Sequence, residues 1–376
     1  MKQFLAKIIV NADYGLKNLL LNCSQKLLFK RLKAGETPGK IIIFRTGSIG
    51  DSICALPAIS VIRNNFPKAT IDILTNSGSA DFVSLDKLID KTQFHAIINY
   101  FGENKRILFK TLKKNSYDLF IDLTQYDARW TKQMKTLLFA RSLGIKHAFG
   151  WRVSQTMLFK KYQEVSRIFI NERDRLLALL AVQGLDTTSS YFIAAKEENT
   201  TRKIIRVMEE LQLTDKSRNI GVVIGSKLER NKWPLDYFKR IIENYTNRDY
   251  KILIFGGKED KEKAETLRIN KNIINFCGTF LPLETAEAMK FCSVVITNDT
   301  GPMHLSYMVK TPVVALFSSR DFPGKWYPPK DGINKVFRSE EVECSACFKR
   351  ECRNNICMKR ITPQMVIAAT DLILKR

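Results

Sequence analysis

The chain has 376 residues, 45% of them apolar, so two domains with ordinary hydrophobic cores are expected. Its 61 Lys and Arg outnumber 38 Asp and Glu, and the resulting net charge of +23 favours a polyanionic partner. No charge-free stretch reaches the roughly 18 residues that a membrane-spanning helix needs. The first ten residues also lack the apolar core of an export signal. These features argue against a transmembrane protein and predict a cytoplasmic one.

Residues 1–38 form a basic, amphipathic extension. Eight Lys or Arg and only two acids occur before residue 41, and Leu and Phe recur beside them at helical spacing. This pattern suits a helix lying on the anionic cytoplasmic face of a membrane, although a helix packed on the protein body would look similar. Gly35, Pro38 and Gly39 end the pattern. The globular part is therefore expected to begin near Lys40 and to fold without the extension.

Short β-branched runs then alternate with segments of helical period, which is typical of α/β domains with parallel sheets. The first domain, residues 39–195, is expected to contain strands Ile41–Phe44, Thr70–Leu74, Ala96–Asn99 and Asp118–Leu123 and helices Ile53–Asn65, Lys105–Lys114 and Ala128–Leu143. A polar stretch at 196–218 is interpreted as a linker that includes a helix.

The alternation begins again over residues 219–376. The expected strands are Ile220–Ile224, Lys251–Phe255, Ile273–Phe276, Val294–Thr297 and Pro312–Leu316, with helices Leu235–Asn244, Asp260–Leu267, Leu283–Lys290 and Pro302–Met308 between or beside them. Parallel sheets bind ligands at the carboxyl ends of their strands, so a cleft between the two domains is the expected place for a reaction of two substrates.

The first motif follows strand Ile41–Phe44 and reads RTGSIGDSICALPA from Arg45. Its two glycines allow a tight turn into a helix whose N-terminus faces the expected cleft. The spacing matches neither a dinucleotide fingerprint nor a P-loop. Asp51, at the start of the helix, is a candidate general base, and its alternative role is to cap the helix.

The second motif reads TNDTGPMH and ends at His304. Thr300 and Gly301 would offer a hydroxyl and backbone N–H groups at a helix N-terminus, which favours an anion such as a diphosphate. Pro302 fits the first helical turn. His304 would lie one turn further on and could add a hydrogen bond, or it could be a buried core histidine.

A third segment contains Lys232 just before a Trp-Pro helix start, where it could reach phosphate as a point charge.

Together and in this order, the three segments resemble those of the ADP-heptose:lipopolysaccharide heptosyltransferases of glycosyltransferase family 9, over residues 40 to about 374. The cysteine-containing segment that starts at Cys344 is most similar to the heptosyltransferase II branch. The resemblance implies a GT-B architecture, with two Rossmann-like domains facing a cleft, the acceptor on the first and the nucleotide sugar on the second. It also implies an inverting transfer with no metal and no cofactor.

Carried over by position, the resemblance makes Asp51 the catalytic base and Lys232 a diphosphate contact. The other expected donor or substrate contacts are Arg45, Ser48, Asp299, Thr300, Gly301 and His304. The implied partners are an ADP-sugar and an anionic lipopolysaccharide acceptor, with a membrane surface as a further partner. Pro302 and the basic extension depart from the usual family pattern; the first should leave phosphate binding intact, and the second bears on location.

Four cysteines lie close together in the sequence, at Cys344, Cys347, Cys352 and Cys357. Their spacing permits a structural zinc or iron–sulfur site, but a zinc ribbon would place its second pair farther away. Reduced thiols or one disulfide are the alternatives.

Two other functions fit parts of the sequence. A family 9 relative that uses another nucleotide sugar or acceptor would carry the same motifs. A basic nucleic-acid-binding protein would share the net charge, but no recognised nucleic-acid-binding module is present, and nucleic acid is not expected as a partner.

Overall fold

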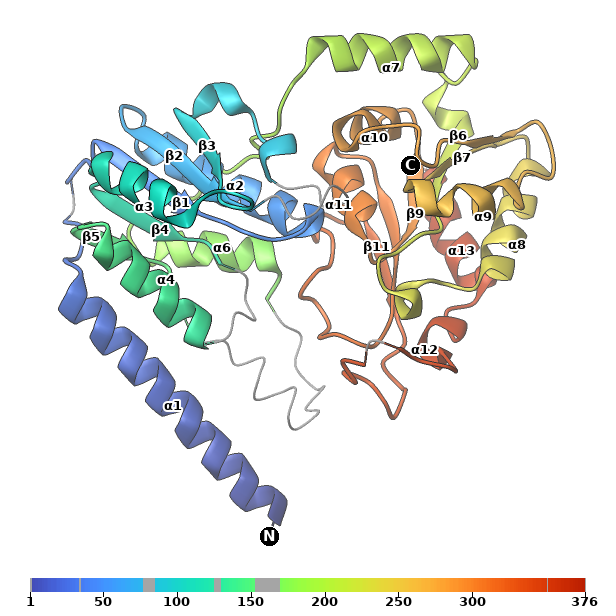
Figure 1. Cartoon of the computed structure of the whole chain (residues 1–376). Helices are drawn as coiled ribbons and strands as arrows, with labels where there is room; N and C mark the ends of the chain where they lie inside the picture. The colour runs from blue at the N-terminus through green and yellow to red at the C-terminus, as the bar shows by residue number, and fades with distance from the viewer. Residues whose placement is uncertain are drawn as a thin grey trace. The chain divides into compact units, whose positions relative to one another are not determined.

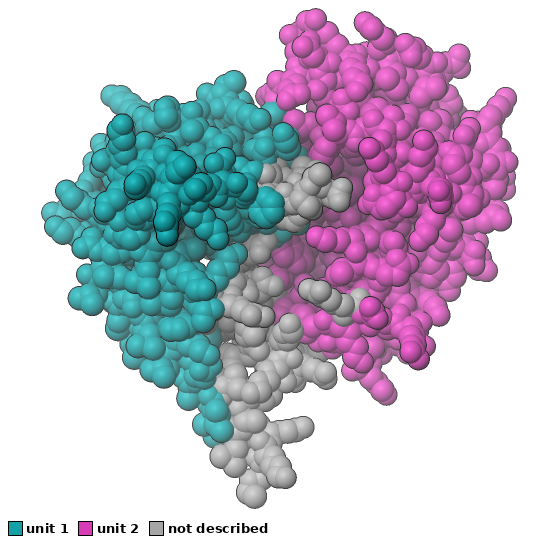
Figure 2. All heavy atoms as spheres, in the orientation of Figure 1, with its two compact units in different colours: residues 1–164, 172–195 teal, residues 165–171, 196–376 magenta. Residues whose placement is uncertain are grey.

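The computed structural model describes residues 2–33, 35–76, 85–124, 130–152, 170–349 and 351–375. The chain divides into two compact units, the first of residues 1–164 and 172–195 and the second of residues 165–171 and 196–376 (Figure 2). Each unit is built on a parallel sheet with helices beside it (Figure 1). The predicted pair of parallel-sheet α/β domains is therefore confirmed.

The sheet of the first unit has the order β3-β2-β1-β4-β5, with every pair parallel. Its strands are β1 (Lys40–Phe44), β2 (Thr70–Thr75), β3 (Ala96–Asn99), β4 (Leu119–Asp122) and β5 (His147–Phe149). Its helices are α1 (Lys2–Leu28), α2 (Ile49–Asn65), α3 (Lys105–Lys114), α4 (Trp130–Ser142) and α6 (Glu172–Ala181). The sequence did not predict β5 or α6, because β5 has only three residues and α6 ends in a continuous Leu and Ala run that lacks an amphipathic period.

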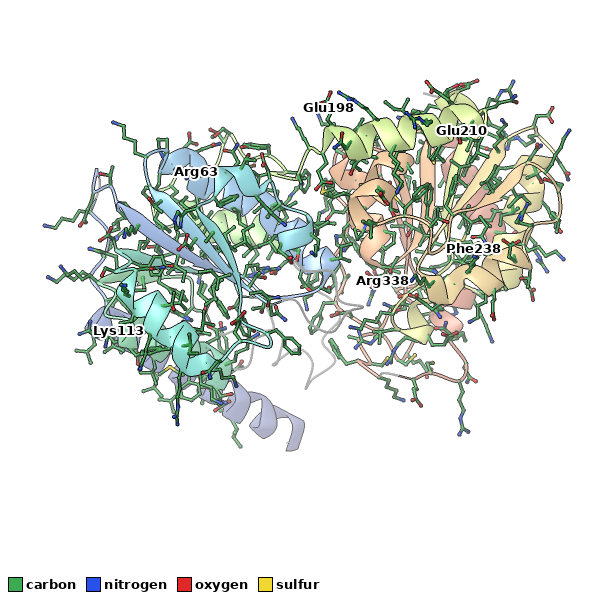
Figure 3. The ribbon with its side chains drawn as sticks, turned by 45° about the horizontal axis from the view of Figure 1, so that its top comes forward. Arg63, Lys113, Glu198, Glu210, Phe238 and Arg338 are labelled. Carbon is green, nitrogen blue, oxygen red and sulfur yellow. The ribbon has the colours of Figure 1, made fainter. Side chains whose placement is uncertain are left out.

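The sheet of the second unit has the order β11-β10-β9-β6-β7-β8, again all parallel. Its strands are β6 (Asn219–Val223), β7 (Lys251–Phe255), β8 (Ile273–Asn275), β9 (Val294–Asn298), β10 (Val313–Phe317) and β11 (Lys335–Arg338). Its helices are α7 (Glu198–Glu210), α8 (Leu235–Thr246), α9 (Lys261–Glu265), α10 (Pro282–Met289), α11 (Gly301–Met308), α12 (Ile356–Lys359) and α13 (Pro363–Leu374). Phe238 of α8, labelled in Figure 3, belongs to the buried core of the second unit.

The amphipathic extension forms one continuous helix, α1, whose C-terminal part belongs to the core of the first unit. Leu21 is fully buried, and Phe29 stacks on Trp151 with ring centroids 5.5 Å apart. The Trp130 indole N–H donates to the backbone oxygen of Lys17 at 3.2 Å. The expectation that the core begins at Lys40 is therefore wrong, because apolar spacing alone does not show which face of a helix other elements cover.

Residues 196–218 contain helix α7, which packs on the second unit. Ile204 and Met208 are fully buried. Lys203 forms a 2.6 Å ion pair with Glu284, the acid in the first turn of α10. This stretch thus contributes an apolar helix face to the second unit.

Candidate active site

Each sheet reverses its strand order at one point, and the sequence motifs follow the strands at those points. In the first sheet the reversal lies between β1 and β4, and in the second between β6 and β9. Open parallel sheets bind ligands outside the carboxyl ends of the strands where the order reverses. The loop after β1 leads into α2, whose first turn carries Asp51, and the loop after β9 carries Asp299 and Thr300. Topology therefore marks one ligand-binding edge in each unit.

The loop after β1 makes a sharp turn before helix α2. Gly47 has φ 143°, a backbone conformation that glycine adopts without steric cost. Its N–H donates to the side-chain oxygen of Asn76, beyond the end of β2, at 3.2 Å. Ser48 is then the N-cap residue of α2. The turn that the two glycines predicted is thus present and is held by a neighbouring strand.

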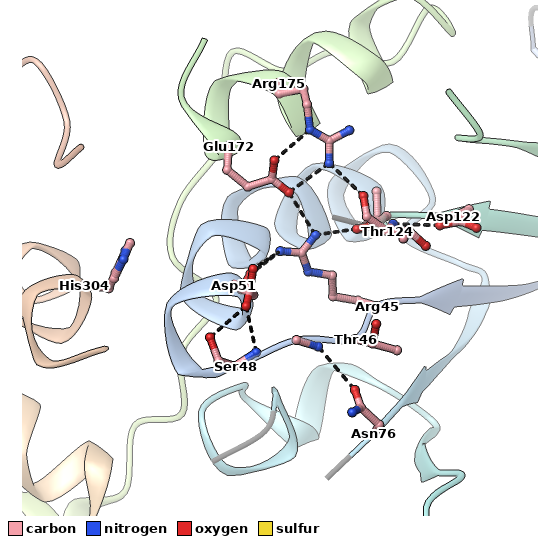
Figure 4. A network of polar contacts seen from close by, with 12 residues as sticks. Arg45, Thr46, Ser48, Asp51, Asn76, Asp122, Thr124, Glu172, Arg175 and His304 are labelled. Atoms are coloured by element: carbon pink, nitrogen blue, oxygen red, sulfur yellow. Dashed lines mark hydrogen bonds and ion pairs between the residues drawn. The ribbon is translucent and has the colours of Figure 1, made fainter. Parts of the chain in front are cut away.

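Asp51 lies at the third position of α2, and its carboxylate closes a capping box with Ser48. Oδ2 accepts from the Ser48 N–H at 2.8 Å and from the Ser48 hydroxyl at 2.7 Å (Figure 4). Oδ1 accepts no hydrogen bond from any residue in the described part of the chain, and the side chain is 11% exposed. One oxygen therefore fixes the carboxylate, and the other is left for an external proton donor.

Arg45 is fully buried and contacts Asp51 through its guanidinium group. One guanidinium nitrogen donates to the Asp51 backbone oxygen at 2.6 Å, and the same nitrogen lies 3.9 Å from Oδ1. The other donates to the backbone oxygen of Leu123, just after β4, and to Glu172 at 3.2 Å. Because no part of Arg45 is exposed, we assign it a positioning role rather than direct contact with substrate.

Glu172 and Arg175, at the start of α6, complete the network around Arg45. Glu172 is fully buried at its side chain and also accepts two hydrogen bonds from Arg175, at 2.8 and 2.9 Å. Burial alone would raise the pKa of Glu172, but Arg175 and Arg45 lower it below its ordinary value. Neither Glu172 nor Arg175 was predicted as a site residue, because in the sequence they stand only in a short cluster of charged residues without a recognisable motif.

We expect Glu172→Gln to destabilise the first unit, because Arg45 would keep a buried charge without the nearer of its two carboxylate partners. Removing one member of a buried ion pair typically costs about 3–5 kcal/mol. Asp174→Asn is the matched control, since the Asp174 side chain is 46% exposed and pairs with its neighbour Arg173. Urea unfolding measures both; equal, small changes in the free energy of unfolding would contradict a central role for Glu172.

In the second unit, Asn298 at the end of β9 fixes the loop that follows β6. Its side chain is fully buried. It accepts from the Trp233 N–H at 2.9 Å and donates to the Ile224 oxygen at 2.8 Å. Ser226 in the same loop donates to the backbone oxygen of Asp299 at 3.1 Å. These bonds bring the third sequence segment beside the second one.

Asp299 lies among polar side chains from two neighbouring loops. Asn231 donates to its Oδ2 at 3.2 Å and accepts from Ser318, beyond β10, at 2.7 Å. Burial, assisted by the negative charge of Asp321, raises the pKa of Asp299 to about 7. Near neutral pH a substantial fraction of this carboxyl is protonated, and it can then donate a hydrogen bond to an anion. Sequence reasoning missed Asn231, which carries no charge.

Helix α11 begins immediately after Asp299, with Thr300 as its N-cap and Gly301 and Pro302 in its first turn. No acidic residue occupies that turn, so its N-terminal dipole is not neutralised locally. His304 is 4% exposed, and its Nδ1 lies 2.6 Å from the Tyr307 hydroxyl. Burial lowers the pKa of His304 to about 3, so the ring is neutral. Any contact it makes with a diphosphate would be that of a neutral hydrogen-bonding group.

Lys232 lies on the loop between β6 and α8 and forms a 2.7 Å ion pair with Glu229. The structure thus places it near the predicted donor edge but already paired.

The four C-terminal cysteines are free thiols, and burial raises the pKa of Cys357. Within the described residues, no three His, Cys, Asp or Glu side chains are arranged to hold a metal ion.

The chain is similar to a known family of proteins and to individual members of it. Residues 106–357 match the profile of glycosyltransferase family 9 (heptosyltransferase). Lipopolysaccharide heptosyltransferase 3 of Escherichia coli (strain K12) is 26% identical over 347 residues, covering 86% of this chain and 95% of the relative. Lipooligosaccharide heptosyltransferase 2 of Campylobacter jejuni (serotype O:6) is 29% identical over 342 residues, covering 87% and 97%.

Solved structures show the same fold. The family 9 glycosyl transferase of Veillonella parvula superposes with a TM-score of 0.70 at 21% identity, covering 89% of this chain and 97% of that one. The Escherichia coli ADP-heptose lipopolysaccharide heptosyltransferase II gives a TM-score of 0.63 at 18% identity, covering 89% and 98%. The family profile spans more than half of the chain, and the predicted resemblance is confirmed: this protein belongs to glycosyltransferase family 9.

Proposed function

We propose that this glycosyltransferase moves heptose from ADP-heptose to the inner core of lipopolysaccharide, with inversion at the sugar and without a metal ion. The observation that carries the proposal is the Asp51 carboxylate, which is fixed through one oxygen at the strand reversal of the first unit. The names of the relatives, which are lipopolysaccharide and lipooligosaccharide heptosyltransferases, support the substrates.

Asp51 would act as the general base. Its Oδ1 would accept the proton of the attacking acceptor hydroxyl, while Ser48 and Arg45 keep the carboxylate in place. The attack displaces the ADP diphosphate from the opposite face of the anomeric carbon, which inverts the configuration at that carbon. The basic charge of the chain suits an acceptor that carries lipid A phosphates and acidic inner-core sugars.

The edge of the second unit would hold the leaving diphosphate. The N-terminus of α11 at Thr300 and Gly301 supplies backbone N–H groups and a favourable dipole. Protonated Asp299 would add a donor beside them, so the affinity for the anionic donor should be higher below pH 7 than above it. A relative that uses another nucleotide sugar would share this edge and remains the alternative.

Transfer to defined, truncated lipopolysaccharides tests the proposal. The purified protein is incubated with ADP-heptose and acceptors that end at successive inner-core positions, and the products are weighed by mass spectrometry. We expect the mass of one heptose to be added to one of these acceptors. Transfer from a different nucleotide sugar, with none from ADP-heptose, would overturn the assigned donor but not the family.

We expect Lys232→Ala and His304→Ala to weaken donor binding more than acceptor binding. Lys232 would contact the diphosphate as a charged group and His304 as a neutral one. Losing the lysine should reduce ADP affinity by about ten- to hundredfold, as for a charge-assisted hydrogen bond, and losing the histidine by less. Calorimetry with ADP measures both; unchanged affinity for either variant would remove that residue from the donor site.

We also propose that α1 holds the enzyme against the cytoplasmic face of the inner membrane. No helix in the described part of the chain is long and apolar enough to cross a bilayer. The described side chains of α1 nevertheless include six exposed large apolar ones, at Ile8, Ile9, Leu16, Leu19, Leu20 and Leu27. In Figure 1 its N-terminal part extends beyond the other elements of the first unit.

These six side chains form one stripe on α1. At about 100° per residue they fall within an arc of about 120°. Leu21 lies outside that arc, on the face that packs against the first unit. Lys26 flanks the stripe, and Lys30, Arg31 and Lys33 follow the helix. An apolar stripe with basic neighbours fits a surface of anionic lipid.

A further inference from the structure

Arg230 is an unusual residue of the second unit, because its guanidinium is buried without a hydrogen-bond partner among the described residues. Only 3% of the residue is exposed, and Nε and both terminal nitrogens lack any hydrogen-bond partner within the described structure. A guanidinium carries five N–H donors, and leaving them unsatisfied away from water is costly. A side chain in this state is expected to bind a partner from outside the described residues.

Arg230 lines a cavity of 490 Å³ beside the loop that follows β6. Five cationic side chains and three carboxylates line it; the cations are Arg230, Lys232, Lys263, Arg353 and Lys359. Two of the carboxylates have other partners: Glu229 pairs with Lys232, and Asp260 accepts from the Gly257 N–H at 3.2 Å. The charge of the lining therefore favours an anion.

Helix α8 also points its N-terminus at this cavity. Pro234 and Leu235, at the start of the helix, belong to the lining. No side chain of the described residues caps that N-terminus, and the acid in its first turn is Asp236. The first N–H groups of a helix are short of partners and attract phosphate oxygens. The cavity thus combines an unpartnered guanidinium with an uncapped helix N-terminus.

We infer that this cavity binds a phosphate group and that Arg230 is its central cation. Guanidinium matches phosphate geometry through two parallel hydrogen bonds, whereas the neighbouring Lys232 is already paired with Glu229. The volume lies in the range of pockets that hold whole small molecules, so the phosphate belongs to a larger ligand or enters alone with water. Where the phosphates are those of the sugar donor, the inference rests on the proposed function and adds Arg230 to its diphosphate contacts.

Calorimetry on the full chain tests the inference with four probes: ADP, adenosine, pyrophosphate and inorganic phosphate. Wild-type protein is compared with Arg230→Gln, Arg230→Lys and the control Arg240→Gln. Arg240 is an exposed arginine on α8 that does not line the cavity. We expect Arg230→Gln to bind ADP and pyrophosphate about ten- to hundredfold more weakly, Arg230→Lys to restore part of the affinity, and adenosine binding and the control to stay unchanged.

The calorimetric results distinguish a phosphate site for the donor from a separate phosphate site and from no site. Loss of pyrophosphate and phosphate binding with ADP unaffected would support a phosphate site separate from the donor. Affinities within twofold of wild type for every phosphate probe would overturn the inference, whatever the transfer assay shows. If wild-type protein binds pyrophosphate but neither ADP nor ADP-heptose, the proposed function fails and the phosphate site stands.

Thermal unfolding without ligand gives a second readout. Replacing a buried charge that has no hydrogen-bond partner by a neutral side chain relieves a desolvation cost. Arg230→Gln should therefore unfold at the same temperature as wild type or higher, and it should lose the stabilisation that pyrophosphate confers on wild type. A large drop in the unfolding temperature would indicate that Arg230 serves the fold, and it would contradict the phosphate site.

Discussion

Asp51→Asn is expected to abolish sugar transfer while ADP affinity stays within a few-fold of wild type. The substitution keeps the shape of the side chain but removes the carboxylate that would accept the acceptor proton. General-base catalysis typically contributes about 10²–10⁴-fold, so the turnover number should fall by that factor. The donor should be little affected, because its expected contacts belong to the second unit.

A capping role for Asp51 makes a different prediction. The capping box with Ser48 would be weakened, and the cost would appear as lost stability, typically about 1 kcal/mol. Asp90→Asn is the matched control, since Asp90 caps a short helical turn in the same unit by accepting from the Thr92 N–H at 3.1 Å. If Asp51→Asn keeps more than about a tenth of wild-type turnover, and its turnover is similar to that of Asp90→Asn, capping is the better explanation of Asp51.

Replacing Leu16, Leu19 and Leu20 together by Gln is expected to release the protein from anionic vesicles. These side chains are 56%, 59% and 46% exposed on the α1 stripe, so their loss should leave the fold intact. Burying a leucine is worth about 1.5–3 kcal/mol, so the triple variant should partition at least about a hundredfold more weakly. Deleting the whole extension would be less informative, because it would remove Leu21 and Phe29 from the core.

Co-sedimentation with phosphatidylcholine vesicles containing phosphatidylglycerol, at low and high salt, measures the effect. The matched control replaces three exposed leucines of the second unit, Leu211, Leu281 and Leu372, by Gln. Binding of wild type should weaken as salt rises, since the basic residues contribute about 1 kcal/mol each near an anionic surface. Wild-type protein that stays in the supernatant at low salt, or a triple variant that binds as wild type does, would refute the membrane role.

The sequence by itself determined the parts that depend on local signals. The strand Ala96–Asn99 and the helix Lys105–Lys114 have the predicted bounds, because apolar period and an N-cap residue act within one turn or strand. The turn at Gly47 followed from glycine chemistry in the same way, and proline chemistry predicted the start of α11 to within one residue, at Pro302 where the helix begins at Gly301. The order of the motifs gave the family.

The tertiary structure alone decided which side chains are covered and which charges meet. Leu20 and Leu21 are adjacent and chemically identical, yet one is 46% exposed and the other fully buried. Arg45 meets Glu172, 127 positions away, and so positions Asp51 instead of facing solvent. Arg230 resembles any other basic residue in the sequence, but its nitrogens are buried without a partner. Burial and charge pairing depend on contacts between segments that are distant in the sequence. A local sequence pattern therefore does not predict which side chains are buried or which charges pair.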